Sequence, residues 1–97
     1  MNPNQITDSD LDAAILKALY PNNRNSDVQL SVDIENSGGA IRTGMRCHDL
    51  ERWGLICCTY TVRDGNASYW QLTAQGRLAV QNLLSREAQT AGGGHCS

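Results

Sequence analysis

Apolar residues near the start of the chain recur at the spacing of a helix. Between residues 8 and 20 they follow three- and four-residue intervals: Leu11, Ala14, Ile15, Ala18 and Leu19. Thr7 or Asp8 can cap this helix, since both side chains accept hydrogen bonds from orphan backbone N–H groups. Pro21 ends it, because the residue before a proline disfavours the helical conformation. The pattern therefore predicts a first helix that buries one face.

The next segment is short and more polar. Residues 22–27 have loop composition, and residues 28–30 are apolar enough to predict a short strand. A brief second helix is expected from Val32 to about Ser37, with Ser31 as its cap. Gly38 and Gly39 supply the turn that follows it.

A third helix is predicted over residues 40–53, with Gly54 at its C-terminal stop. Two registers are open for its buried face. The first buries Leu50 and the positions that share its side: Ala40, Thr43 and Cys47. The second buries a different set: Ile41, Met45 and Trp53. We favour the first register, because it keeps Arg42 and Arg46 accessible on the N-terminal half of the helix.

A hairpin follows, with strands at residues 55–62 and 67–72. The turn at residues 63–66 contains Asp64-Gly65, a pair that accepts the positive φ of tight turns. One face of the first strand is expected to face the core: Ile56, Cys58, Tyr60 and Val62. Trp70 and Leu72 are expected to close over the same core.

A last helix begins at Ala74, with Thr73 as its cap. It carries more apolar surface than packing of a small domain needs: Leu78, Val80, Leu83 and Leu84. We therefore expect this helix to support a homodimer interface. Residues 1–6 are expected to form a flexible N-terminus, residues 7–88 one domain, and residues 89–97 a disordered glycine-rich tail.

This order of elements predicts an α+β winged helix-turn-helix: a three-helix core, a β-hairpin wing and a C-terminal helix. Three segments, residues 49–56 (DLERWGLI), the Asp64-Gly65 hairpin and residues 69–77 (YWQLTAQGR), resemble MarR-like and related bacterial or phage transcriptional regulators. The resemblance covers roughly residues 7–85 and is firmest from 47 to 77.

The resemblance implies a dimer that binds duplex DNA, with the third helix in the major groove and the wing beside it. Carried over by position, Arg42, Thr43 and Arg46 are the helix contacts and Arg63 is the wing contact. Ile41 and Met45 are unusual beside them, because apolar side chains do not bind phosphate. They contact thymine methyl groups, or they mark a protein-binding surface.

Charge is distributed unevenly along the chain. The net charge is −2, which does not favour a strongly basic nucleic-acid binder. Residues 1–36 hold six acidic and two basic side chains, whereas residues 37–97 hold four acidic and six basic ones. All the arginines but one therefore belong to the part that would touch DNA.

Cysteine and histidine pairs invite a metal-sensor hypothesis. The pairs are Cys47-His48, Cys57-Cys58 and His95-Cys96. No Cys-x-x-Cys spacing is present, and adjacent residues of a strand point to opposite faces. We favour small buried thiols plus a free thiol in the tail, with no bound metal and no cofactor. Without a secretory pattern, the thiols are expected to be reduced and the protein cytoplasmic, with no membrane segment.

The sequence shows no residue pattern typical of a catalytic site. The sequence has no glycine-rich phosphate loop after a buried strand, and Cys47 and His48 point about 100° apart on a helix. We therefore expect a protein that is not an enzyme. The leading hypothesis is a small transcriptional regulator or repressor that binds duplex DNA. The alternative is a winged-helix protein-interaction module, such as a phage- or plasmid-type inhibitor or assembly subunit, that does not bind DNA itself.

Overall fold

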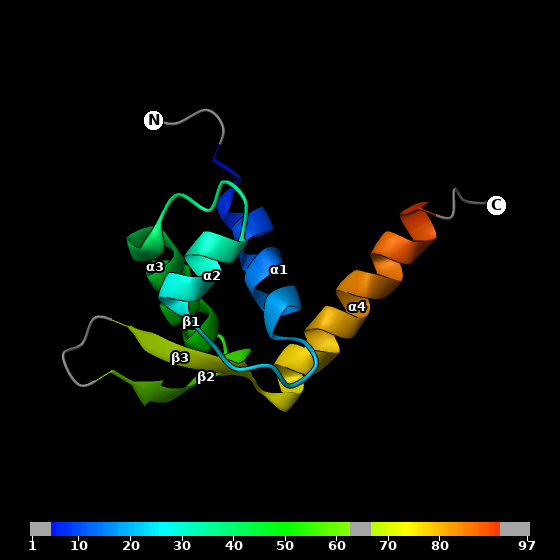
Figure 1. Ribbon diagram of the computed structural model, residues 1–97. Coiled ribbons are helices and arrows are strands. Elements are labelled where there is room, and N and C mark those ends of the chain that lie inside the picture. Colours follow the sequence, from blue (N-terminus) through cyan, green and yellow to red (C-terminus); the bar gives the residue numbers. More distant parts are fainter. Residues whose placement is uncertain (1–4, 63–66, 92–97) are drawn as a thin grey trace.

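The structure is a computed structural model that describes residues 5–62 and 67–91 of the chain. The elements follow in the order α1 (Asp8–Leu19), β1 (Asn25–Ser26), α2 (Asp27–Asp33), α3 (Ala40–Arg52), β2 (Ile56–Thr61), β3 (Ser68–Leu72) and α4 (Ala74–Ala91). Helices α1, α2 and α3 gather on one side of the sheet, and α4 leads away from them (Figure 1). This is the predicted α+β winged helix. Each helix in the described ranges is too short or too polar to cross a membrane.

Helix α1 begins and ends close to the predicted positions. The Thr7 side chain accepts a hydrogen bond from the Asp10 backbone N–H at 3.1 Å, so Thr7 is the cap. The helix ends at Leu19, one residue before the predicted end. Its buried side chains are Leu11, Ile15, Leu16 and Leu19.

The segment before α3 corrects three predictions. The second helix, expected from Val32 to about Ser37, lies earlier, at Asp27–Asp33. Residues 28–30, expected as a strand, belong to α2, and the short strand lies earlier, at Asn25–Ser26. Ser26, not Ser31, caps α2, because its hydroxyl accepts the Gln29 backbone N–H at 3.0 Å. Strand β1 and the Ser26 cap both lie in the segment 22–27, whose polar composition indicated a loop. A strand of two residues is too short to show an apolar pattern. Gly38 and Gly39 have φ of 88° and 102°, as a turn requires.

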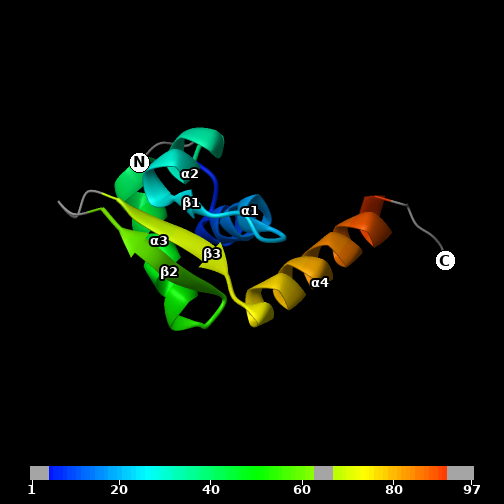
Figure 2. The ribbon, with the colours of Figure 1, turned by 60° about the horizontal axis from the view of Figure 1, so that its bottom comes forward.

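The sheet places β3 between β1 and β2, and both neighbours are antiparallel to it (Figure 2). Ile56 pairs with Leu72 and Cys58 pairs with Trp70. A bulge between Cys58 and Tyr60 then shifts the register. Beyond Cys58 the bulge breaks the alternation that predicted an inner face of β2, so it accounts for Tyr60 and Val62. Of the four side chains expected there, only Ile56 is buried, whereas Cys58 and Tyr60 are exposed and Val62 is half-buried.

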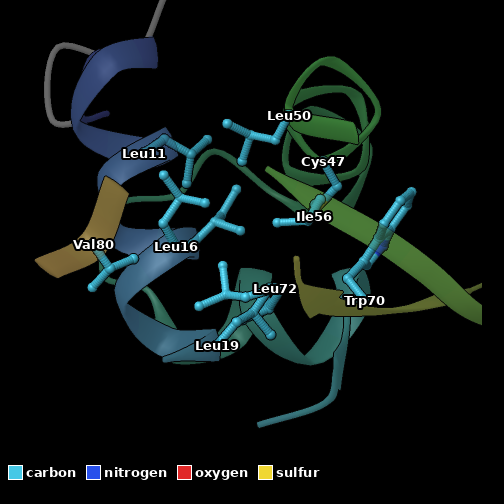
Figure 3. Packing of buried hydrophobic residues seen from close by; sticks show 11 residues of the cluster. Leu11, Leu16, Leu19, Cys47, Leu50, Ile56, Trp70, Leu72 and Val80 are labelled. Atoms are coloured by element: carbon cyan, nitrogen blue, oxygen red, sulfur yellow. The ribbon is translucent and has the colours of Figure 1, made fainter. Parts of the chain in front are cut away.

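One core joins the helices to the sheet (Figure 3). Trp70 and Leu72 close over it as predicted, at 0% and 3% exposure. The other buried apolar side chains come from every helix and from β2: Leu11, Ile15, Leu16, Leu19, Leu30, Cys47, Leu50, Ile56 and Val80. Full burial of an aliphatic side chain contributes about 1.5–3 kcal/mol, so this cluster is the main source of stability.

Helix α4 starts at a tight junction. The Thr73 hydroxyl accepts the Gly76 backbone N–H at 3.0 Å and donates to the Gly54 carbonyl at 2.6 Å. Gly76 lies so close to Leu55 that a Cβ there would be 1.9 Å from the Leu55 carbonyl oxygen. The helix continues to Ala91, so residues 89–91, expected as the start of the tail, are helical.

Candidate functional site

Helix α3 presents a different kind of side chain on each of its sides. The buried stripe consists of Thr43, Cys47 and Leu50, three of the four positions of the first predicted register; the fourth, Ala40, is half-buried. These positions are four and three residues apart, so they lie above one another on one face. Leu50 and Cys47 pack in the core, and the Thr43 hydroxyl donates to the Gly39 carbonyl at 2.9 Å.

A second stripe of α3 faces α1 and consists of Arg42, Arg46 and Asp49. The Arg46 guanidinium donates from Nε and Nη2 to the two carboxylate oxygens of Asp12, each at 2.8 Å. Its Nη1 donates to Asp49 at 2.8 Å. The hydrogen bond to Asp12 is the largest cause that raises the pKa of Arg46 above its ordinary value, although burial opposes it.

Arg42 is held in the same way, one turn earlier. Its guanidinium donates to the backbone carbonyls of Ser37 and Ile6, at 2.9 and 2.6 Å. It also pairs with the Asp8 carboxylate at 2.9 Å. The side chains of Arg42 and Arg46 are only 22% and 17% exposed. Both arginines therefore hold α3 against the start of α1.

The exposed stripe of α3 runs the length of the helix. Its members are four and three residues apart: Ile41, Met45, His48 and Arg52. Ile41 is 84% exposed and Met45 is 64% exposed. The Arg52 side chain is 77% exposed and has only a distant contact, 3.8 Å, with Asp49. The first half of the stripe is thus apolar and the second half is polar and basic.

Helix α2 borders this stripe and forms a shallow hollow with it. The hollow has a volume of about 250 Å³. It is lined by Asp27, Val28, Ala40, Ile41, Gly44, Met45 and His48. Gly44 allows the close approach of α2, because a Cβ there would lie 3.2 Å from a carboxylate oxygen of Asp27. This contact explains a glycine in the middle of a helix.

The predicted contact residues are therefore distributed over different sides. Ile41 and Met45 are exposed, Arg42 and Arg46 are engaged with carboxylates, and Thr43 is fully buried. The carboxylate partners were missed by sequence reasoning. The signal for them was the spacing of Asp8 and Asp12, four residues apart on one face of α1. Arg63, the predicted wing contact, lies outside the described residues.

The cysteines correct another expectation. Cys47 is buried as expected, and burial, with the nearby charges of Asp27 and Asp12, raises the pKa of its thiol to about 12. Cys57 and Cys58, expected as buried thiols, are both exposed. Within residues 5–62 and 67–91, no group of three or more His, Cys, Asp or Glu side chains is placed to hold a metal ion.

A second hollow lies on the sheet, away from α3. It has a volume of about 470 Å³ and is lined by Arg24, Thr59, Tyr60 and Tyr69. The rings of Tyr60 and Tyr69 are tilted by 50° with centroids 6.1 Å apart. Among the described residues, Arg24 has no carboxylate within ion-pair distance. Arg24 is therefore an exposed cation beside the hairpin.

Comparison with known proteins gives similarity in structure only. No protein-family model matches the chain, and no curated protein matches it in sequence. Two solved structures of mutant Lactococcus lactis ZitR superpose with a TM-score of 0.70, at 15% and 16% sequence identity. The first, in apo form, covers 88% of this chain and 62% of that one, and the second covers 90% and 56%. The chain thus spans about three fifths of ZitR, and the likeness concerns the fold.

Proposed function

We propose that this chain is a small winged-helix regulator of transcription that binds duplex DNA through α3 and the hairpin, as MarR-like proteins do. The observation that carries the proposal is the exposed stripe of α3 (Ile41, Met45, His48 and Arg52), which spans the whole helix beside the hairpin. In this fold the corresponding helix enters the major groove. The structural likeness to ZitR supports the same use of the fold.

The cations are proposed to divide into two roles. Arg52, and Arg63 in the wing, contact phosphates, since phosphate contacts position a protein on the duplex. Arg42 and Arg46 position α3 and neutralise the carboxylates of α1 that would otherwise repel DNA. We assign no contact to Thr43, because its side chain is buried.

We further propose that the protein acts as a homodimer through α4 and, as a dimer, as a repressor. Leu78 and Leu84 are 60% and 40% exposed on this helix. A second copy would cover both side chains and place two α3 helices on one duplex. Half-sites about one helical turn apart would follow from that symmetry.

A second candidate function is a protein-interaction module on the same face. It is favoured by the apolar side chains around the hollow between α2 and α3, where Val28 is 41% exposed beside Ile41 and Met45. Exposed apolar patches with a polar rim often bind protein partners. This candidate predicts no duplex binding at low salt.

The test is fluorescence anisotropy of a labelled random-sequence duplex at 50 and 200 mM salt. Binding that weakens steeply with salt is the expected result, since counterions are released from the phosphates. Arg52→Ala should reduce the log–log salt slope by about 1. Lys17→Ala on α1 is the matched control, because it removes the same charge from a side chain that is paired with Glu87, and it should leave the slope unchanged. Absence of binding at 50 mM salt would contradict the proposal and favour the protein partner.

A further inference from the structure

The N-terminal half of α3 offers no hydrogen-bonding side chain to a ligand on its exposed face. Between residues 40 and 46, the exposed side chains are those of Ile41 and Met45 alone. Arg42 and Arg46 have their guanidinium groups committed to α1 and to backbone carbonyls. The side chains that usually read base edges by hydrogen bonds are therefore directed away from this face.

The major groove of DNA offers one apolar group to such a surface. Each base pair presents hydrogen-bond donors and acceptors there, and thymine adds its C5-methyl group. An apolar side chain gains free energy by covering this methyl and gains nothing from an acceptor or donor that it leaves unpaired. We propose that Ile41 and Met45 read thymine methyl groups, so that the protein prefers A·T-rich duplex; this inference rests on the proposed function.

The position of the two side chains fits this use. Ile41 and Met45 are one turn apart, on the same side of α3, and in the half of a recognition helix that meets the bases. Val28 and Ala40 extend the apolar surface around them. Ile41 and Met45 therefore belong to a continuous apolar surface.

Three of the carboxylates near the stripe are paired with arginines, which reduces their repulsion of DNA. Asp8, Asp12 and Asp49 lie near the arginines of α3, and each forms an ion pair with Arg42 or Arg46. Asp27, at the edge of the hollow, has one carboxylate oxygen turned to the Ser68 backbone N–H at 3.4 Å. Arg52 stands exposed at the far end of the same stripe and can meet a phosphate.

His48 does not replace the missing hydrogen-bonding groups. Its ring stands edge-on to the Trp70 ring at a centroid distance of 5.2 Å. Its Nδ1 lies 3.9 Å from a carboxylate oxygen of Glu51. The Trp70 contact holds one edge of the imidazole against β3, and His48 lies beyond residues 40–46, the half of α3 proposed to read bases.

The test compares two duplexes of otherwise identical sequence. One contains thymine, and in the other uracil replaces every thymine. The two differ only in the C5-methyl groups. Anisotropy at one salt concentration should give a lower affinity for the uracil duplex than for the thymine duplex. The expected difference is about fourfold for each methyl that the protein covers, which corresponds to about 0.8 kcal/mol of binding free energy. Ile41→Ala and Met45→Ala should each reduce this ratio towards 1. Val32→Ala on α2, which is 73% exposed and outside the hollow, is the control and should keep it.

The outcomes separate the inference from the proposed function. Equal, salt-dependent binding of both duplexes would overturn methyl recognition and leave DNA binding intact. A thymine preference that survives Ile41→Ala/Met45→Ala would overturn the assignment to these residues. A protein that prefers 5-methylcytosine over cytosine in a uracil-containing duplex, but does not prefer thymine over uracil, would also overturn the recognition of thymine methyl groups. Binding to neither duplex would contradict both proposals at once.

Discussion

Arg46 of α3 and Asp12 of α1 form a two-point ion pair, with Nε and Nη2 of the guanidinium each 2.8 Å from a carboxylate oxygen. Both side chains are mostly shielded, at 17% and 15% exposure. The planar guanidinium fixes the orientation of α3 as well as its distance from α1. Arg46 is therefore part of the framework that presents the exposed stripe, and Asp49 on the same helix supports it.

Arg46→Ala should lower the free energy of unfolding by about 2 kcal/mol, because it leaves the partly buried Asp12 carboxylate without its partner. Urea denaturation measures this loss. Arg52→Ala is the matched control, and it should cost less than about 0.5 kcal/mol because the Arg52 side chain is 77% exposed. A loss of unfolding free energy in Arg46→Ala as small as that expected for Arg52→Ala would show that Arg46 has no structural role.

Gly76→Ala should destabilise the protein by about 1–3 kcal/mol, although alanine favours a helix. The added Cβ would lie 1.9 Å from the Leu55 carbonyl oxygen, so α4 or the start of β2 must move. Thermal unfolding followed by circular dichroism checks the change. Val32→Ala, at a 73% exposed site on α2, should have little effect. A gain of about 1 kcal/mol in Gly76→Ala, the propensity difference alone, would contradict the close contact.

The Cys47 thiol should resist modification while the protein is folded. Burial raises its pKa from 9.0 to about 12, so at pH 8 it stays neutral in the folded state, and only the thiolate reacts. A variant with Cys57, Cys58 and Cys96 all replaced by serine keeps Cys47 alone. Its reaction with a thiol reagent at pH 8 should be slow until urea unfolds the protein. Fast reaction without urea would contradict the burial of Cys47.

The same pKa shift predicts a loss of stability in alkali. Below pH 9.0 the thiol is neutral in both states, and above it the unfolded thiol ionises first, so the free energy of unfolding falls between about pH 9 and 12. Cys47→Ala removes this contribution. The difference in unfolding free energy between wild type and Cys47→Ala should therefore shrink from pH 8 to pH 10.5. A constant difference would mean that the folded-state pKa is ordinary.

The proposed dimer gives a prediction for α4. Leu78→Asp and Leu84→Asp should convert a dimer into a monomer, because a carboxylate in an apolar interface is costly to desolvate. Analytical ultracentrifugation distinguishes the two states. Val32→Asp places the same charge at a 73% exposed site on α2 and should leave the dimer intact. A wild-type monomer at all concentrations would contradict the use of α4 as an interface.

Most of the fold could be predicted from the sequence, because the residues that cap or end its helices are clear. Thr7, Gly54 and Thr73 cap or end helices where predicted, and the spacing of Thr43, Cys47 and Leu50 identified the buried face of α3. Strand β1 escaped prediction, because two polar residues carry no apolar pattern. The bulge after Cys58 also escaped, since one extra residue breaks the alternation without leaving a compositional mark.

The site was harder to predict for a different reason. Whether an arginine side chain of α3 is engaged in an ion pair depends on a partner far away in the chain, and Asp12 is 34 residues before Arg46. Periodicity separates buried from unburied positions, but it does not separate a side chain held by an ion pair from one open to solvent. Ile41 and Met45 gave the better signal, because apolar residues outside the buried register must be exposed.

Amide chemical-shift mapping shows which residues of the protein meet duplex DNA, and the exposed stripe of α3 is the surface expected to do so. A ¹⁵N-labelled sample is titrated with a short A·T-rich duplex at low salt. We expect the largest shifts at residues 40–48 and in the hairpin, with small shifts in the second half of α4. Absence of shifts, or shifts confined to α4, would contradict this expectation.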